Sequence, residues 1–384
     1  MADLAPLLTW DSQLRGILLY LAVIALNTLL NWLSLPRLGK SPAPQNWPAV
    51  AILVPARDEE ANIRRCITSL LAQDYPDFSV WVLDDASTDA TPSILAELSA
   101  AESRLHVLQN ASLPRGWLGK NWACHQLAAS VPADVPLLLF VDADTWHAPT
   151  MLRHSVAALL VNQADLLSAL PQQETRTLAE MLTVPLLPWA LFSHFPLWLT
   201  RRVRWPRLSA AVGQHMLWRR SAYQQVGGHV AVRHEIVEDM ALARQAAKRG
   251  LRVLLLPGRG QVFCQMYHST ADAIAGFGKN LFSVFERRLL TYGFVWLWLG
   301  FVFLGPWLAL FWSWTAGATT TFSSALVAIV LTLLIWGMVV RLSGMRPLIV
   351  PLSPFIVLSS ILLALHSLGQ TLTHRGEWKG RRIS

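Results

Sequence analysis

One short stretch, Leu137 to Asp144, constrains the fold of this chain most strongly. It reads Leu-Leu-Leu-Phe-Val-Asp-Ala-Asp, an apolar run that ends in two carboxylates. The run is too short for a helix and lacks helical spacing, so it predicts a central strand of a parallel sheet. Ligands of open α/β sheets bind at the carboxyl ends of the strands, and Asp142 and Asp144 are therefore expected to face a ligand.

The chemistry of this pair indicates a divalent cation. Two hard oxygen ligands suit Mg²⁺ or Mn²⁺, and an ion at a strand end is well placed to hold a diphosphate. A lone Asp-x-Asp arises by chance about once in a chain of this length, so the pair has weight only with its surroundings. The cysteines Cys66, Cys124 and Cys264 lie far apart, without metal-binding spacing, and are expected to be small buried residues.

Composition places part of the chain in lipid. Of its 384 residues, 53% are hydrophobic, whereas a soluble protein has about 45–50% apolar residues. The net charge of +8 is modest, and the basic residues lie beside apolar stretches. This pattern favours an anionic membrane surface as a partner and argues against nucleic acid.

Four apolar segments are long enough to be membrane helices, for which about 20 residues are needed. One lies near the N-terminus, and the other three follow the central part of the chain: Gly16 to Leu35, Tyr292 to Trp314, Ser324 to Val340 and Leu348 to Leu372. Basic residues Arg37 and Lys40 follow the first segment, which predicts a multi-pass protein whose next domain lies in the cytoplasm.

The last apolar segment conflicts with this simple topology. Three spans after a cytoplasmic domain would place the tail outside, yet the tail is rich in arginine and lysine, which belong inside. Prolines crowd the start of the segment at positions 347, 351 and 354. A re-entrant or interfacial hairpin there would resolve the conflict. The expected domains are residues 1–40, 41–288, 289–372 and a basic tail, 373–384.

The region between the membrane segments alternates strand and helix patterns. Strands are expected at Ala49 to Val54, Val80 to Leu83, His106 to Leu108 and Arg252 to Leu256, with helices from Ile63 to Leu71, from about Asn121, and from Glu238 to Arg249. This order predicts a mostly parallel, Rossmann-like α/β sheet. Residues 178–207 hold an apolar run broken by prolines and then several arginines. They indicate either an interfacial segment on anionic lipid or a core segment followed by a basic loop.

Four motifs follow one another at predicted strand ends and helix starts. They are Val-Pro-Ala-Arg-Asp-Glu-Glu at 54–60, Leu-Asp-Asp-Ala-Ser-Thr-Asp at 83–89, Asp142-Ala-Asp144 and Glu238-Asp239. This series resembles the family 2 glycosyltransferases with the GT-A fold. Residues 114–123, 142–149, 213–239, 276–282 and 378–381 are similar to the membrane-bound branch associated with hopanoid and carotenoid glycosylation.

The resemblance implies roles for the donor side of the site. The donor would be a nucleotide-sugar, and Asp144 would bind the divalent cation, with Asp142 reaching the cation or the ribose. Asp85 would bind the base, bordered by Pro55, Ala56 and Arg57, with Glu59 nearby. Lys120 would reach a phosphate as a point charge, unless it is a solvated loop lysine.

The resemblance also implies a candidate base. Asp239 would take the proton from an acceptor hydroxyl that attacks the anomeric carbon and inverts it. Glu238 would belong to the donor site beside it. The alternative for this acidic pair is the ordinary negative charge of a helix start. Trp378 and Arg381 in the tail could close over the donor diphosphate, or could anchor the tail at the interface.

The expected function is transfer of one sugar, from a UDP-hexose, to a hydroxyl of a membrane lipid such as a carotenoid or hopanoid. Diacylglycerol and a polyprenyl phosphate stay open as acceptors. A processive polysaccharide synthase is the first alternative, but the Gln-x-x-Arg-Trp motif of such enzymes does not occur after Asp239. The second is a non-catalytic nucleotide-sugar-binding partner of a lipid-export assembly.

Overall fold

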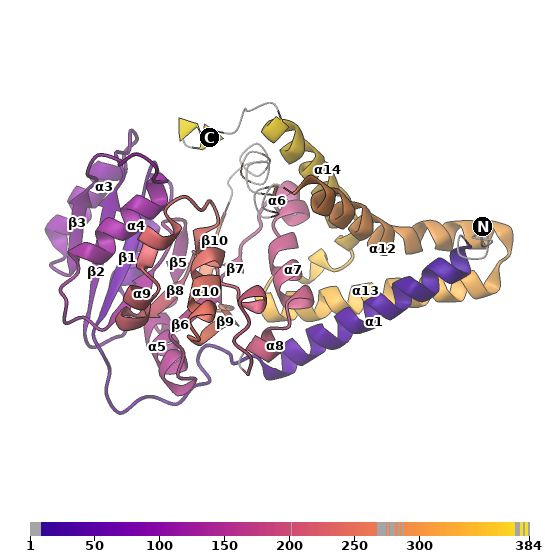
Figure 1. Cartoon of the computed structure of the whole chain (residues 1–384), viewed down its shortest axis with the longest axis horizontal. Coiled ribbons are helices and arrows are strands. Elements are labelled where there is room, and N and C mark those ends of the chain that lie inside the picture. The colour runs from indigo at the N-terminus through magenta and orange to yellow at the C-terminus, as the bar shows by residue number, and fades with distance from the viewer. Residues whose placement is uncertain are drawn as a thin grey trace. The chain divides into compact units, whose positions relative to one another are not determined.

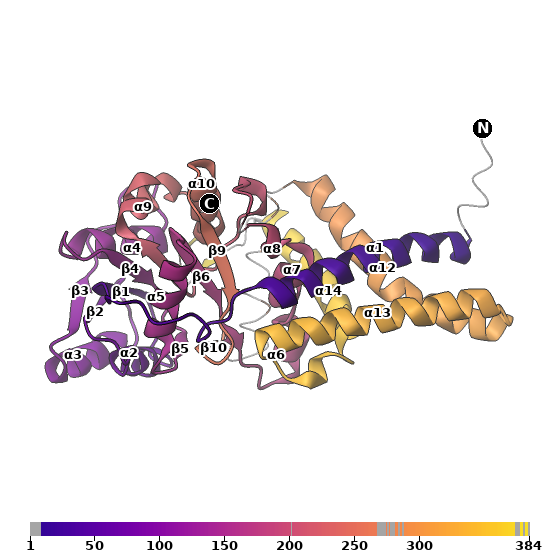
Figure 2. The same ribbon diagram turned by 90° about the horizontal axis from the view of Figure 1, so that it is seen from below.

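The computed structural model (Figures 1 and 2) describes residues 9–200, 202–266, 274, 276, 281, 282, 285, 288–372, 377, 378, 381 and 382. The chain forms two compact units. A helical unit consists of Met1–Ser34, Thr175–Pro196 and Tyr267–Ser384. A sheet unit consists of Leu35–Glu174 and Leu197–Met266.

The sheet unit is built on seven strands in the order β3-β2-β1-β4-β8-β6-β9. Their bounds are β1 Val50–Ala56, β2 Phe78–Asp84, β3 Leu105–Gln109, β4 Leu137–Phe140, β6 Leu166–Leu170, β8 Met216–Arg219 and β9 Val253–Pro257. Strand β8 runs antiparallel to both of its neighbours, and the other pairs are parallel. The mostly parallel sheet and the strands expected around positions 50, 80, 106, 137 and 253 are confirmed.

Helices cover both faces of this sheet because its strands are apolar on both sides (Figures 1 and 2). In β1, Val50, Ile52 and Val54 belong to one buried cluster, and Ala51 and Leu53 belong to the other. The first cluster is completed by α2 Ile63–Leu71, α3 Thr91–Ala101 and α5 Met151–Val161. The second is completed by α4 Gly119–Ser130, α9 Arg220–Gln225 and α10 Glu238–Lys248.

A smaller sheet continues from the end of β4. It has the order β5-β10-β7, with β5 Thr145–His147, β10 Val262–Cys264 and β7 Gln172–Gln173. Two 3-10 helices, η2 Pro206–Leu208 and η3 Gly228–Val232, flank β8 along the chain. All three cysteines are free and buried, as their spacing predicts.

Among its described residues, the helical unit contains four helices that are long and apolar enough to cross a membrane. They are α1 Trp10–Ser34, α12 Leu289–Ala316, α13 Thr319–Ser343 and α14 Ser353–Leu372. This confirms one such helix before the sheet unit and three after it. Helix α13 packs against α1 and α12, and α14 packs against α12. A short 3-10 helix, η5 Pro347–Ile349, precedes α14, and the tail forms a backbone pairing of β11 Glu377–Trp378 with β12 Arg381–Arg382.

The proline-rich segment after residue 175 forms three short helices, α6 Leu178–Thr183, α7 Leu186–His194 and α8 Leu197–Thr200. Residues up to Pro196 belong to the helical unit, where α7 packs against α1 and α13 and α6 packs against α14. Residues from Leu197 belong to the sheet unit. The expected interfacial role of 178–207 and the expected domain boundaries stay predictions.

Two asparagines on α1 satisfy the carbonyl groups at the end of α7. Asn31 Nδ2 donates to the carbonyl oxygens of Phe192 and Phe195, both at 2.8 Å. Asn27 Nδ2, one turn earlier, donates to Ser193 O at 2.7 Å. Helix α7 ends at His194, and Pro196 has no N–H to offer, so these carbonyls need other donors. In apolar surroundings, leaving them unpaired would be costly.

We therefore predict that Asn31→Ala destabilises the protein. It leaves buried carbonyls without a donor, which lowers the free energy of unfolding by about 1–3 kcal/mol. Thermal unfolding in detergent measures this. Ser323→Ala is the control because its hydroxyl is exposed on α13. Equal melting temperatures for Asn31→Ala and the wild type would contradict the capping role.

Candidate active site

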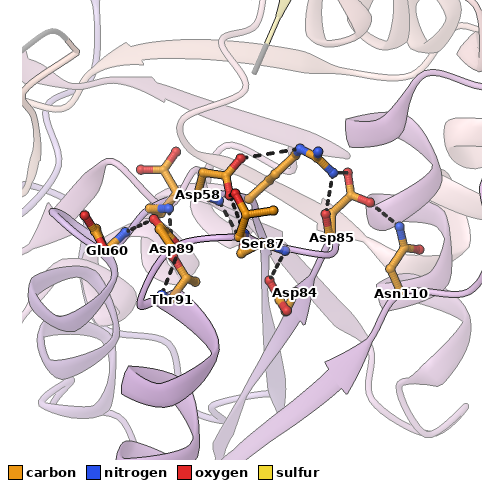
Figure 3. A network of polar contacts seen from close by, with 11 residues as sticks. Asp58, Glu60, Asp84, Asp85, Ser87, Asp89, Thr91 and Asn110 are labelled. Atoms are coloured by element: carbon orange, nitrogen blue, oxygen red, sulfur yellow. Dashed lines mark hydrogen bonds and ion pairs between the residues drawn. The ribbon is translucent and has the colours of Figure 1, made fainter. Parts of the chain in front are cut away.

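The ends of β1 and β2 are joined by polar contacts (Figure 3). The Asp85 N–H donates to Ala56 O at 2.8 Å. Arg57 follows β1, and its Nη1 donates to Asp85 O at 2.7 Å and lies 3.8 Å from Asp85 Oδ2. The guanidinium is thus held across the edge of the sheet, beside the aspartate to which the family resemblance gives the nucleotide base.

The carboxylate of Asp85 is also held from the next strand. Asn110, which follows β3, donates from Nδ2 to Asp85 Oδ1, and Gln126 of α4 donates to Asn110 Oδ1. Figure 3 shows Asp85 and Asn110 directed toward one another. Asp85 is buried. Asn110 was not predicted as a site residue, because an asparagine after a strand has no distinguishing signal in one sequence.

The loops that follow β1 and β2 bind each other through side chains and backbone (Figure 3). Thr88 N–H donates to Asp58 Oδ1 at 2.7 Å, and Glu60 N–H donates to Asp89 Oδ2 at 3.0 Å. Asp58 and Ala86 have φ of 49° and 54°, values that residues other than glycine adopt only in well-determined turns. These hydrogen bonds hold the end of β1 and its loop in place. This segment contains the predicted donor residues Pro55, Ala56, Arg57 and Glu59.

Asp142 and Asp144 lie just beyond β4, as predicted. The carbonyl oxygen of Asp142 accepts hydrogen bonds from Thr145 N–H at 3.2 Å and from Thr145 Oγ1 at 2.7 Å. Asp144 Oδ1 is buried without a hydrogen-bond partner in the described part of the chain. Burial raises the pKa of the Asp144 carboxyl to about 8, and the charges of Asp142 and Glu59 add to this shift.

Lys120 connects this strand end to helix α10. Its Nζ lies 2.8 Å from Asp142 Oδ1 and 2.9 Å from Glu238 Oε1. Burial lowers the pKa of Lys120, but the charges of Asp142 and Glu238 outweigh burial and raise it above its ordinary value. Lys120 lies in the first turn of α4 and is part-buried. It is therefore not a solvated loop lysine, which was the alternative expected from the sequence. Its contact with a phosphate stays a prediction.

Asp239 lies in the first turn of α10 and is held by backbone donors. Gly213 N–H donates to Asp239 Oδ2 at 2.7 Å, and Met240 N–H donates to Asp239 Oδ1 at 2.7 Å. Burial raises the pKa of the Asp239 carboxyl to about 7 and the charge of Glu238 adds to this shift, whereas Lys120 and the two N–H groups oppose it. A base with a pKa near neutrality suits proton transfer.

Five carboxyl groups make up what we call the carboxylate cluster: Glu59, Asp142, Asp144, Glu238 and Asp239. Each interacts electrostatically with Lys120 or with another member. Lys120 brings one positive charge, so the cluster is rich in negative charge and suits a further cation. The unpartnered Asp144 Oδ1 fits a Mg²⁺ or Mn²⁺ ligand. Among the described residues, in this cluster or elsewhere, no three or more His, Cys, Asp or Glu side chains are arranged to hold a metal ion by themselves.

His147 lies close to this cluster in sequence but differs in environment. It is buried, and neither ring nitrogen has a hydrogen-bond partner within the described ranges. Burial and nearby His215 lower its pKa well below the ordinary value, so the ring is neutral at pH 7. The side chains of Trp378 and Arg381, assigned to the donor by resemblance, lie outside what the structure describes.

Residues 51–227 match the family model described as Glycosyl transferase family 2. The mannosyltransferase PcManGT from Pyrobaculum calidifontis, solved in complex with GDP-Man and Mn2+, superposes with a TM-score of 0.57 at 17% identity. That superposition covers 95% of this chain and 99% of the other. It supports the predicted GT-A-like α/β fold.

Two curated relatives carry lipid-related names. A beta-monoglucosyldiacylglycerol synthase from Nostoc sp. is 34% identical over 153 residues, which is 39% of this chain and 31% of the relative. A 4,4'-diaponeurosporenoate glycosyltransferase from Staphylococcus aureus is 28% identical over 250 residues, which is 62% of this chain and 61% of the relative. The chain thus spans under two thirds of the length of either relative.

The raised pKa of Asp239 predicts how the stability of the folded protein depends on pH. The folded carboxyl keeps its proton up to about pH 7, whereas an unfolded aspartate loses it near its ordinary pKa of about 3.9. The folded state is therefore favoured at low pH, and this contribution disappears as pH rises toward 7. With a chelator present, we expect the melting temperature of Asp239→Asn to rise relative to that of the wild type as the pH increases from about 4 to 7. Glu235→Gln, at an exposed position, is the control; a pH-independent difference for Asp239→Asn would contradict the shift.

Proposed function

Because residues 51–227 form a domain of glycosyl transferase family 2, we propose that this protein transfers one sugar from a nucleotide-sugar to a hydroxyl of a membrane lipid. The proposed donor is a UDP-hexose, and the proposed acceptor is a carotenoid or hopanoid-like lipid. One observation carries the proposal. Asp239, a carboxylate held by two backbone N–H groups, belongs to the same cluster as Asp142 and Asp144.

The donor would lie along the edge formed by β1, β2 and β4. Asp85 and Arg57 would contact the nucleotide, since they are fixed at adjoining strand ends. Asp144, together with Asp142, would hold Mg²⁺ or Mn²⁺, with the remaining ligands coming from the diphosphate and water. A divalent cation there would stabilise the charge of the departing diphosphate.

Asp239 would act as the general base. The acceptor oxygen forms a bond to the anomeric carbon while the bond from that carbon to the diphosphate oxygen breaks. The hydroxyl proton passes to Asp239, and the diphosphate leaves with the bonding electron pair. Attack opposite the leaving group inverts the anomeric centre. Gly213 and Met240 keep both carboxylate oxygens in place, which limits the motion of the base.

A lipid acceptor is supported by the chain's own apolar helices and by the names of its relatives. Four helices are long and apolar enough to cross a membrane. The two curated relatives are named for diacylglycerol and carotenoid glycosylation. Arg37 and Lys40 follow α1, and we propose on this basis that the catalytic unit faces the cytoplasm and an anionic membrane surface.

The test of the catalytic role is release of the nucleoside diphosphate. Detergent-purified protein, supplied with candidate lipids and a panel of nucleotide-sugars with Mn²⁺, should release nucleoside diphosphate. Asp239→Asn should lower kcat by about 10²- to 10⁴-fold, the usual contribution of a general base. Glu235→Gln should match the wild type. An active Asp239→Asn variant would refute the assignment, and wild-type binding without turnover on any donor would favour a binding partner instead.

The cation site has a separate prediction. Asp144→Asn should weaken Mn²⁺-dependent binding of the nucleoside diphosphate by about 10- to 100-fold, because it removes one of two carboxylate ligands. Asp239→Asn should bind nearly as tightly as the wild type. Calorimetric titration with and without Mn²⁺ measures both. Undiminished Mn²⁺-dependent binding by Asp144→Asn would contradict the cation assignment.

A further inference from the structure

The absence of a side chain at position 213 has a specific consequence for the carboxylate cluster. A Cβ built on Gly213 would lie 3.0 Å from Lys120 Nζ, 3.5 Å from Glu238 Oε1 and 3.6 Å from Asp239 Oδ2. The last two distances are ordinary contacts. The first is tight, so the ammonium group of Lys120 would have to shift by a few tenths of an ångström to admit a methyl group.

The backbone of Gly213 is firmly placed. The preceding residue, Val212, exchanges hydrogen bonds with Ser168 of β6: Val212 N–H donates to Ser168 Oγ at 2.9 Å, and that hydroxyl donates to Val212 O at 3.1 Å. Ala169 N–H donates to His215 O at 3.1 Å. Ser168 is fully buried. The segment is therefore fixed to the sheet on both sides of Gly213, and its N–H points to Asp239 with little freedom.

From these contacts we propose that Gly213 is a positioning residue for the candidate base. Its N–H holds Asp239 Oδ2, and its lack of a side chain leaves the space in which Lys120 binds both Asp142 and Glu238. The inference rests on the proposed glycosyl transfer, which it extends to a residue that contacts the candidate base through its backbone. The Lys120 bridge fixes the strand end that would carry the donor against the helix that carries the base.

Gly213→Ala separates this role from a role in folding. The backbone of Gly213 does not adopt the left-handed conformation that would strain an alanine, and the atom that must move is the tip of a flexible lysine. The fold should survive while the bridge is displaced. We expect kcat to fall by about 10- to 100-fold, as for other small misplacements of catalytic groups. The melting temperature should stay near the wild-type value.

A double-mutant cycle with Lys120→Ala identifies the cause. If Gly213 acts by leaving room for the ammonium group, adding Gly213→Ala to Lys120→Ala should change kcat by less than about twofold. Gly337→Ala is the matched control, because a Cβ there meets nothing within 4 Å. An undiminished kcat in Gly213→Ala overturns the inference. An equal loss in both backgrounds overturns it too, as does a loss of kcat matched by a lower melting temperature.

A second readout does not depend on catalysis. Amine labelling followed by mass spectrometry measures the reactivity of each lysine, with the exposed Lys40 and Lys248 as internal references. In Gly213→Ala, Lys120 should react several-fold faster because its ion pairs with Asp142 and Glu238 are weakened, whereas the references should not change. If the wild type transfers no sugar from any donor, the proposed function fails and this labelling still decides the bridge. Unchanged Lys120 reactivity overturns the inference.

Discussion

The ion pairs of one lysine bring the parts of this site together. Lys120, at the start of α4, binds Asp142 after β4 and Glu238 at the start of α10. These residues are far apart in sequence, and each lies at the end of an element whose packing is set by the apolar core. A part-buried ion pair contributes little net stability, but its charge-assisted hydrogen bonds orient the groups that it joins. In this protein, that geometry joins the candidate donor edge to the candidate base.

The negative charge that remains has a chemical consequence. Burial raises the pKa values of Asp144 and Asp239 toward neutrality, so each carboxyl is poised to exchange a proton or to bind a cation near pH 7. Asp144 follows Asp142, which Lys120 binds at the end of β4, and Asp239 follows Glu238, which Lys120 binds at the start of α10. This division suits the two tasks of glycosyl transfer, which are stabilising a leaving diphosphate and accepting the proton of an attacking hydroxyl.

Much of this could be predicted from the sequence because the signals are local. The strand before Asp142 and the apolar face of α2 follow from short periodic patterns, and the four apolar helices follow from length and hydropathy. The antiparallel strand β8 was missed, because Met216–Arg219 is a four-residue strand with no turn signal beside it. In the sequence, Gly213 has significance only as the first residue of 213–239, one of the stretches that carry the family resemblance. Its role depends on the approach of Lys120 from 93 positions away, which no local pattern encodes.

The most direct measurement is mass spectrometry of membrane lipids. Membranes containing the protein would be given isotope-labelled UDP-glucose and Mn²⁺, beside membranes containing Asp239→Asn. The account predicts a labelled glycolipid with the wild type and none with the variant, and the mass of that lipid would identify the acceptor. Equal labelled product from both membranes would contradict the account, because sugar transfer would then proceed without the carboxylate on which the proposed chemistry depends.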